Sequence, residues 1–440
     1  MADLSPQEKI ALIKENLQEV LREDIIEDVI VKQNRPLVIY FGTATTGRPH
    51  CGYLVPFMKL SHFLRAGCRV KVLLADIHGF LDNLKAPIEL VNYRATYYKF
   101  VITSVLKAIG VDISKLEFVL GSSYQLSSKY TMDLFRLSSM VTEHDAKKAG
   151  AEVVKQVDNA PLSGLIYPLM QALDEEHLGV DAQFGGVDQR KIFALAQESL
   201  GRIGYKQRAH LMNPMVPGLA GGKMSSSEPD SKIDFLDSAE VVKKKLKKAY
   251  AKAMEVEGNG IISFIEYVLL PLSSLQSETM QARFVIERRP EEGEALVYTN
   301  IEDVKRDYLE DKLTPQLLKS SVTDALNAIL APVQAEFLAS KEWQEIEKLA
   351  YPPPPEPAKK KKAPKDKGSR YPGAGPGAAK GTSSGPEKAP LAPATESTKA
   401  GNEIVAEEDG SVHAPEKVQV GTGVEQAMGK LGVDGKAGES

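Results

Sequence analysis

The segment from residue 37 to residue 58 constrains the fold of this chain more than any other part of the sequence. Residues 37–41 are a short β-branched and aromatic run, which is typical of a buried strand. A loop of small residues follows at 42–53, and apolar residues then resume at helical spacing. A strand, a glycine-bearing loop and a helix in this order direct free backbone N–H groups toward a ligand above the strand, which is how phosphates are held. The loop lacks the P-loop ending and the dinucleotide fingerprint. Alone, it predicts either an anion site or an ordinary strand–helix turn.

A second segment, residues 218–227, is a glycine-rich approach to Lys223 and three serines. A lone lysine beside serines usually belongs to a solvated loop. Together with residues 50–53, in this order and at this separation, it resembles the HIGH and KMSKS signatures of the class I aminoacyl-tRNA synthetases. Further matches narrow the resemblance to the tyrosyl-tRNA synthetases of the eukaryotic cytosolic type, and it covers roughly residues 5 to 350. These matches are YFGTATTG at 40–47, QALDEE at 171–176 and GGVDQRK at 185–191.

The resemblance implies a reaction in two steps. The carboxylate of L-tyrosine attacks the α-phosphate of ATP, which gives tyrosyl-adenylate and pyrophosphate, and a terminal ribose hydroxyl of tRNA(Tyr) then takes the tyrosyl group. A carboxylate is already a nucleophile, so we expect alignment and charge neutralisation rather than a general base in the first step. The implied partners are L-tyrosine, tRNA(Tyr) and ATP with Mg²⁺ as co-substrate. We expect no tightly bound, protein-ligated metal.

Both signature motifs contribute to the expected nucleotide site. By the resemblance, His50 contacts phosphate, with Thr45 and Arg48 as weaker candidates, and Lys223 reaches the β- and γ-phosphates as a point charge. Asp188 resembles the ribose-binding acid of the family. The expected catalytic residues are His50, Lys223 and Thr45. The expected ATP-binding residues are Gly42, His50, Gly52, Gly185, Gly186, Asp188, Lys223, Met224, Ser225, Ser226 and Ser227.

Two positions depart from the motifs. Tyr53 stands where HIGH ends in a second histidine, as it does in eukaryotic tyrosyl enzymes, and Ser226 replaces the second lysine of KMSKS. One positive charge is therefore missing from the KMSKS loop. We expect a bound cation or Arg48 to neutralise the charge that develops on the leaving pyrophosphate.

The expected tyrosine pocket lies partly on one helix. Tyr167, Gln171 and Asp174 are four and then three residues apart, so they share one helix face, with Pro168 expected at the start of the helix. On spacing alone, such a polar stripe usually faces solvent. By the resemblance, Tyr40 and Asp174 hold the phenolic hydroxyl of the substrate, Tyr167 and Gln171 hold its ammonium group, and Gln189 lies close by. A buried aspartate that accepts from a phenol also explains rejection of phenylalanine, which would leave the carboxylate unpaired.

Several basic residues are candidates for tRNA contact. Arg190 and Lys191 directly follow the ribose-binding motif and are placed to meet the acceptor end. The lysine run at 243–248 is either a solvated helix face, a nuclear-localisation signal or a tRNA contact, and for the last we expect Lys244 and Lys247. Animal members of the family carry a tryptophan in the segment corresponding to 284–298, which this chain lacks. The residue that stacks on the anticodon therefore stays open.

The order of elements predicts an α/β fold. Further strands at 70–75, 116–120 and 209–215 alternate with helical segments, which predicts a Rossmann-like, doubly wound parallel sheet with ligands at the carboxyl ends of its strands. A helix capped by Ser5 is expected to present an apolar face as far as Leu21, and Asp237 is expected to cap a later helix. We expect a catalytic domain at 1–236 with a helical dimerisation insertion at about 127–160, an α-helical anticodon-binding domain at 237–350 and a disordered tail at 351–440. The resemblance implies a homodimer.

Composition limits the remaining choices. The net charge of −4 gives no bulk attraction to nucleic acid, so a tRNA surface must be a local patch. The two cysteines, Cys51 and Cys68, have neither disulfide-framework nor metal-ligand spacing, which fits a reducing compartment. The N-terminus has no secretory or mitochondrial pattern, and no apolar run reaches membrane-spanning length. We expect a cytoplasmic protein without a membrane partner.

Three other readings compete with a tyrosyl enzyme. A tryptophanyl enzyme shares the fold and mechanism, but Tyr40 with Asp174 favours a phenol over an indole. A catalytically silent RNA-binding paralogue would not need His50, Lys223 and Asp188 together. A small-molecule nucleotidylyltransferase would share the HIGH-like fold, but would not need a helical domain or basic patches.

Overall fold

A six-stranded sheet is at the centre of the computed structural model, which describes residues 4–82, 87–154, 161–218, 232–277 and 279–353. Its strand order is β1-β6-β5-β2-β3-β4. All neighbouring pairs are parallel except the edge strand β1, which runs antiparallel to β6. The predicted doubly wound parallel sheet is thus confirmed. The strands are β1 (Glu19–Leu21), β2 (Val38–Thr43), β3 (Arg69–Leu74), β4 (Leu116–Leu120), β5 (Ala182–Gly186) and β6 (Ala209–Asn213).

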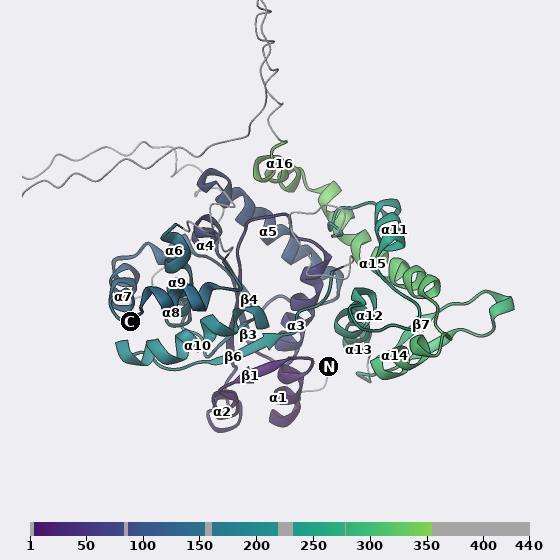
Figure 1. The fold of residues 1–440 in the computed structure, drawn as a ribbon, viewed down its shortest axis with the longest axis horizontal. Helices are drawn as coiled ribbons and strands as arrows, with labels where there is room; N and C mark the ends of the chain where they lie inside the picture. The colour runs from purple at the N-terminus through teal and green to yellow at the C-terminus, as the bar shows by residue number, and fades with distance from the viewer. Residues whose placement is uncertain (1–3, 83–86, 155–160, 219–231, 278, 354–440) are drawn as a thin grey trace, which may run out of the picture. The chain divides into compact units, whose positions relative to one another are not determined.

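Helices cover both faces of this sheet. Figure 1 shows α3 and α5 on one side of the strands, and α8, α9 and α10 on the other. Because side chains alternate along a strand, Ile39 and Phe41 of β2 belong to the core under α3 and α5, whereas Tyr40 points toward α9. The helices of this region are α1 (Pro6–Lys14), α2 (Glu23–Glu27), α3 (Leu54–Arg65), α4 (Asp76–Leu81), α5 (Ile88–Ala108), α6 (Ser122–Gln125), α7 (Ser128–Ser138), α8 (Glu143–Gly150), α9 (Ser163–His177) and α10 (Arg190–Ser199).

The N-terminal segment agrees with the prediction only in its first half. Ser5 and Glu8 form the expected capping box of α1. The apolar face expected as far as Leu21 is wrong, because α1 ends at Lys14 and residues 19–21 form strand β1 instead. Asn16 has a φ of 58°, which interrupts the helix. The strand is specified by a distant partner, β6, with Val20 opposite Leu211.

The chain after residue 236 is mainly helical, with one addition. The prediction of helices without strands is wrong at a small hairpin, β7 (Phe284–Ile286) with β8 (Leu296–Tyr298). The N-cap of the first helix here is Ser238 rather than the predicted Asp237, whose carboxylate accepts from the Asp234 N–H at 2.8 Å. The helices are α11 (Ala239–Lys248), α12 (Gly260–Phe264), α13 (Leu270–Gln276), α14 (Ile301–Leu309), α15 (Pro315–Ala339) and α16 (Lys341–Ala350).

Several predictions fall wholly or partly outside the described residues. These are the KMSKS segment at 223–227, the end of the expected dimerisation insertion at 155–160 and nearly all of the expected tail. The described part of the insertion is helical, as predicted, and consists of α7 and α8. No described helix is long and apolar enough to cross a membrane.

Candidate active site

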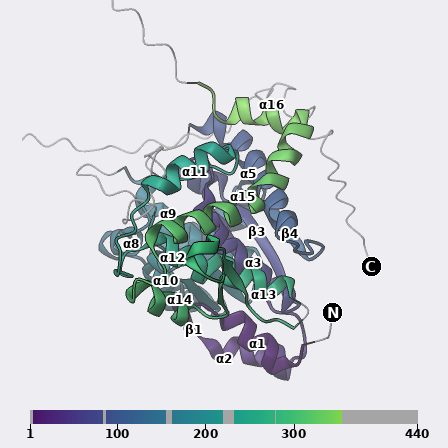
Figure 2. The ribbon, with the colours of Figure 1, turned by 90° about the vertical axis from the view of Figure 1, so that its right-hand side faces the viewer.

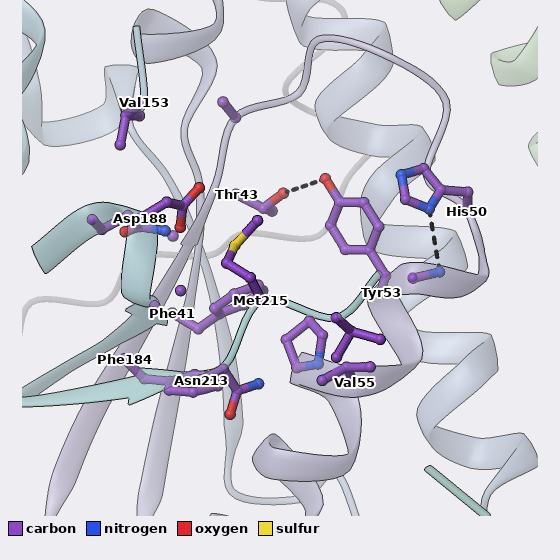
Figure 3. A pocket seen from close by; sticks show the side chains of 18 of the residues that line it. Phe41, Thr43, His50, Tyr53, Val55, Val153, Phe184, Asp188, Asn213 and Met215 are labelled. Atoms are coloured by element: carbon purple, nitrogen blue, oxygen red, sulfur yellow. Dashed lines mark hydrogen bonds between the residues drawn. The ribbon is translucent and has the colours of Figure 1, made fainter. Parts of the chain in front are cut away.

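A cavity of about 490 Å³ lies at the carboxyl ends of β2 and β5. The sheet reverses its winding between these two strands, and such a switch point is where ligands bind in open α/β sheets. Figure 3 shows side chains from β2, the 42–53 loop, β5 and the segment after β6 around this space. The predicted residues that line it are Tyr40, Gly42, His50, Gly52, Tyr167, Gln171, Asp174, Gly185, Gly186, Asp188 and Gln189.

His50 lies at the start of a 3-10 turn, Cys51–Tyr53, that leads into α3. Its Nδ1 accepts a hydrogen bond from the Gly52 N–H at 3.2 Å (Figure 3). Burial, with a smaller effect from the nearby positive charge of Lys232, lowers the pKa of His50 to about 4. The ring is therefore neutral at pH 7, and because Nδ1 accepts, Nε2 carries the proton. His50 thus offers one N–H donor beside the N-terminus of α3.

The other end of the cavity is organised around Asp174, whose side chain is fully buried. Its Oδ1 accepts three hydrogen bonds, from Tyr124 Oη at 2.7 Å, Tyr130 Oη at 2.9 Å and Gln125 Nε2 at 2.9 Å. Its Oδ2 has no hydrogen-bond partner among the described residues, and lies 3.8 Å from His78 Nε2. Burial raises the pKa of Asp174 to about 7, although the three donors oppose this rise. One carboxylate oxygen is therefore saturated, and the other is left for a ligand.

Tyr167, Gln171 and Asp174 all lie on the buried face of α9. The solvent-facing alternative for this stripe is thus excluded. Gln171 Nε2 donates to Gln189 Oε1 at 2.8 Å, and the ring of Tyr167 packs edge-on against His78 with centroids 4.7 Å apart. Pro168 was predicted at the start of this helix, and this prediction is wrong. Pro168 lies inside the helix, because α9 begins at Ser163.

Two glycines allow the end of β5 to turn toward the cavity. A Cβ at Gly185 would lie 2.5 Å from Gln189 Oε1, and a Cβ at Gly186 would lie 2.4 Å from Asp188 Oδ1. A side chain at either position would displace the end of the Gln189 or Asp188 side chain, so the two glycines leave room for these side chains in their present positions. A Cβ at Gly42, by contrast, would make only ordinary contacts.

The chain matches the family model described as class I tRNA synthetases (W and Y) over residues 32–331. It is 56% identical over 375 residues to the cytoplasmic tyrosine–tRNA ligase of Saccharomyces cerevisiae, covering 85% of this chain and 95% of that protein. The chain belongs to the tyrosyl-tRNA synthetases of the cytoplasmic type. It is also 55% identical to the zebrafish (Danio rerio) cytoplasmic enzyme over 358 residues, which are 81% of this chain but 65% of that longer protein.

Solved structures agree with this assignment. A tyrosyl-tRNA synthetase from Archaeoglobus fulgidus, complexed with L-tyrosine, has a TM-score of 0.69 and 37% identity, covering 75% of this chain and 99% of that one. A tryptophanyl-tRNA synthetase from Aeropyrum pernix has a TM-score of 0.55 at 20% identity, covering 75% of this chain and 85% of that one. The second likeness is one of fold alone.

Thr45 and Arg48 were predicted as phosphate contacts but do not line the cavity. Thr45 is fully buried, and its hydroxyl has no hydrogen-bond partner among the described residues. Arg48 is paired with Glu347 at 2.6 Å and lies 3.9 Å from Asp234, which speaks against the predicted role of its charge at the pyrophosphate. The expected tRNA contacts Arg190 and Lys191 are surface residues that pair with Glu19 at 2.8 Å and Glu152 at 2.8 Å, respectively.

The sequence reasoning missed the residues around Asp174 and the role of Tyr53. Tyr124, Gln125 and Tyr130 follow β4 and carry no local motif, so only the fold brings them to α9. The Tyr53 hydroxyl lies 3.4 Å from Thr43 Oγ1 (Figure 3) and 3.5 Å from Tyr98 Oη. It therefore supports the loop beside His50. Among the described residues, no three His, Cys, Asp or Glu side chains are grouped to hold a metal ion.

Proposed function

We propose that this tyrosyl-tRNA synthetase selects tyrosine through Asp174 and activates it with ATP in the cavity at the β2–β5 switch point. The observation that carries this proposal is the single unpartnered oxygen of a fully buried carboxylate. A phenolic hydroxyl that donates to Asp174 Oδ2 satisfies that oxygen. Phenylalanine would leave it buried and unpaired, which is the basis of strong discrimination in sites built for a hydroxyl.

The neighbours of Asp174 hold it in place for this task. Tyr124, Gln125 and Tyr130 each donate a hydrogen bond to Oδ1, so the carboxylate is held with Oδ2 turned away from these donors. The Tyr40 hydroxyl donates to the Gln171 carbonyl at 3.2 Å and lies near enough to Asp174 for that charge to raise the pKa of Tyr40, after the larger effect of burial. Tyr40 thus remains protonated at the phenol end, with its hydroxyl oriented by the Gln171 carbonyl. Tyr167, Gln171 and Gln189 supply polar groups at the ammonium end.

ATP occupies the part of the cavity between the 42–53 loop and the end of β5 in this proposal. His50 donates from Nε2 to a phosphate, Gly42 and Gly52 allow close approach, and Asp188 accepts from the ribose. No general base is required, because the tyrosine carboxylate is the nucleophile. Mg²⁺ enters with ATP as part of the co-substrate. By the family motif, Lys223 to Ser227 act on the β- and γ-phosphates.

The second substrate is tRNA(Tyr), and the functional unit is a homodimer. Arg190, Lys191, Lys244 and Lys247 are surface residues of α10 and α11 that we assign to tRNA. Exposed apolar side chains on and around the helical insertion support a dimer contact there: Leu126, Met132, Phe135 and Leu162. The relatives named above are cytoplasmic enzymes, and we assign the same compartment.

Amino-acid-dependent exchange of pyrophosphate into ATP tests the proposed function. Tyrosine, tryptophan and phenylalanine are compared in parallel with the full chain. We expect exchange with tyrosine alone. Equal exchange with tryptophan would show that the cavity does not select for a phenol, and would refute tyrosine as the selected amino acid.

A further inference from the structure

The last described helix, α16, holds the loop that leads into His50. Figure 2 shows α16 across one end of α5 and beside α15. Trp343 anchors it, since this side chain is fully buried and its ring stacks on Phe100 of α5 with centroids 5.5 Å apart. The ring also packs edge-on against Tyr97 of α5 and Phe337 of α15. The position of α16 is thus fixed by apolar contacts with α5 and α15, and one of these rings, Tyr97, also lies 5.8 Å from the Arg48 guanidinium.

The end of α16 is joined to residues 46–48 by two direct hydrogen bonds and by a bridge through Arg94 of α5. Tyr351 Oη donates to the Gly47 carbonyl at 2.8 Å, and Arg48 Nη2 donates to Glu347 Oε1 at 2.6 Å. Arg94 joins the two segments, because its Nε donates to the Ala350 carbonyl at 3.1 Å while its Nη1 donates to the Thr46 carbonyl. Thr46, Gly47 and Arg48 are therefore connected to residues 347–351, either directly or through Arg94.

Arg48 extends this connection to the segment after the KMSKS region. Its guanidinium lies over the Tyr351 ring, 4.7 Å from the centroid, and its Nη1 is 3.9 Å from Asp234. Asp234 in turn forms an isolated antiparallel bridge with His50. One guanidinium thus contacts α16 and the strand-like segment that borders the catalytic histidine.

The tyrosine end of the cavity has a different support. Asp174 is held by Tyr124 and Gln125 of α6 and by Tyr130 of α7. Within the described part of the chain, none of the hydrogen bonds of these residues involves 46–48 or α16. A disturbance at α16 should therefore reach the nucleotide end before it reaches the tyrosine end.

We infer that Glu347 and Tyr351 are positioning residues for adenylate formation, which fix loop 46–48 and thereby the approach of His50 to ATP. The inference rests on the proposed function, since it concerns the same reaction. It also gives a structural role to Tyr351, which was predicted to begin the disordered tail but contacts the loop. Small displacements of groups that align a reaction cost large factors in rate, even when the displaced residue does not touch substrate.

The test compares Glu347→Gln, Tyr351→Phe and their double variant in the full chain. Glu345→Gln, on an exposed position of the same helix, and Tyr351→Leu, which removes the ring as well as the hydroxyl, complete the set. The KM for ATP and the KM for tyrosine are measured separately by pyrophosphate exchange. Loss of one neutral hydrogen bond changes an equilibrium by about two- to tenfold. We expect the double variant to raise the KM for ATP, or lower kcat, about three- to tenfold, with the KM for tyrosine within about twofold of wild type.

The relative size of the kinetic effects of these variants distinguishes a positioning role from a general effect on protein stability. Tyr351→Leu should exceed Tyr351→Phe in its effect on ATP, and Glu345→Gln should match wild type. A double variant with wild-type kinetics for both substrates overturns the inference, as does an equal rise in both KM values with a lower Tm. Wild-type protein that gives no tyrosine-dependent exchange would instead refute the proposed function, so the two failures are distinct.

Discussion

Replacement of Asp174 by asparagine should stabilise the protein while it removes tyrosine recognition. The carboxyl group is fully buried, and its pKa is raised from 3.8 to about 7, chiefly by burial. The folded protein thus binds this proton more tightly than the unfolded chain does. The contribution of Asp174 to stability is greatest below about pH 4 and is lost as the pH rises through about 7.

The magnitude follows from the size of the shift. One pKa unit corresponds to about 1.4 kcal/mol, so an ionised Asp174 costs up to about 4 kcal/mol of folding free energy at pH 8 in the absence of tyrosine. Asparagine does not titrate and keeps an oxygen for the three donors. The free energy of unfolding of Asp174→Asn should therefore exceed that of wild type at pH 8, and this advantage should shrink toward pH 5.

The same substitution removes the acceptor for the phenol. Loss of a hydrogen bond to a charged group costs about 1.5–3 kcal/mol, which corresponds to about a 10- to 150-fold loss in kcat/KM for tyrosine. Discrimination against phenylalanine should fall with it. Urea unfolding at pH 5, 6, 7 and 8 without tyrosine, with the exposed Asp324→Asn of α15 as control, measures the stability effect. Parallel stability profiles for wild type and variant, or unchanged selectivity between the two amino acids, would refute the reasoning.

Three further predictions concern the nucleotide end and the tail. Lys223→Ala should lower the rate of adenylate formation far more than tyrosine affinity, as pre-steady-state kinetics would show, because its charge acts mainly in the transition state; lost affinity with an unchanged forward rate would contradict this. His50→Ala should slow exchange about 10- to 100-fold, and because burial lowers the pKa of His50 to about 4, the wild-type rate should show no titration of this residue between pH 6 and 8. Removal of the chain after Pro353 should leave exchange and Tm unchanged and flatten the salt dependence of the KM for tRNA, because the lysines at 359–362 are lost. Removal after Leu349 should in addition raise the KM for ATP, since Tyr351 is then absent; superimposable salt curves for the full chain and the Pro353 truncation would leave the tail without a part in charging.

The fold was predictable where one local pattern was enough. The strands β2 and β3 are mostly apolar and largely buried runs, and the edge strand β4 is apolar but only partly buried, so their sequences alone indicate strands of a parallel sheet. Strand β1 has three residues and becomes a strand only by pairing with β6, nearly 200 residues later in the sequence. The hairpin of β7 and β8 is equally short. Pairing of this kind depends on tertiary structure and leaves little trace in the local sequence.

The residues of the candidate site also fall into two groups: those that a local motif indicates and those that only the tertiary structure reveals. Motif residues such as His50 and Asp174 were found because each belongs to a recognisable segment. Tyr124 and Gln125, which saturate Asp174 Oδ1, lie about fifty residues from it and carry no motif. The ion pair of Arg48 could not be predicted for a related reason, because its partner Glu347 lies 299 residues away. Composition and spacing identify a candidate side chain, but they do not identify the distant neighbour that forms a hydrogen bond or an ion pair with it.

The two ends of the cavity are therefore supported by different parts of the chain. In the proposed function, selection of the amino acid depends on a buried carboxylate whose neighbours come from α6 and α7, within the sheet-based region. In our further inference, alignment of ATP depends on a loop that is held by α16, the last helix of the described chain. Substitutions at the first set should change which amino acid is activated, whereas substitutions at the second should change how fast ATP is used. Because no hydrogen bond or ion pair among the described residues joins the two supports, the two properties should vary independently, so a variant of Tyr351 that altered selectivity between tyrosine and phenylalanine would show that the ends are coupled.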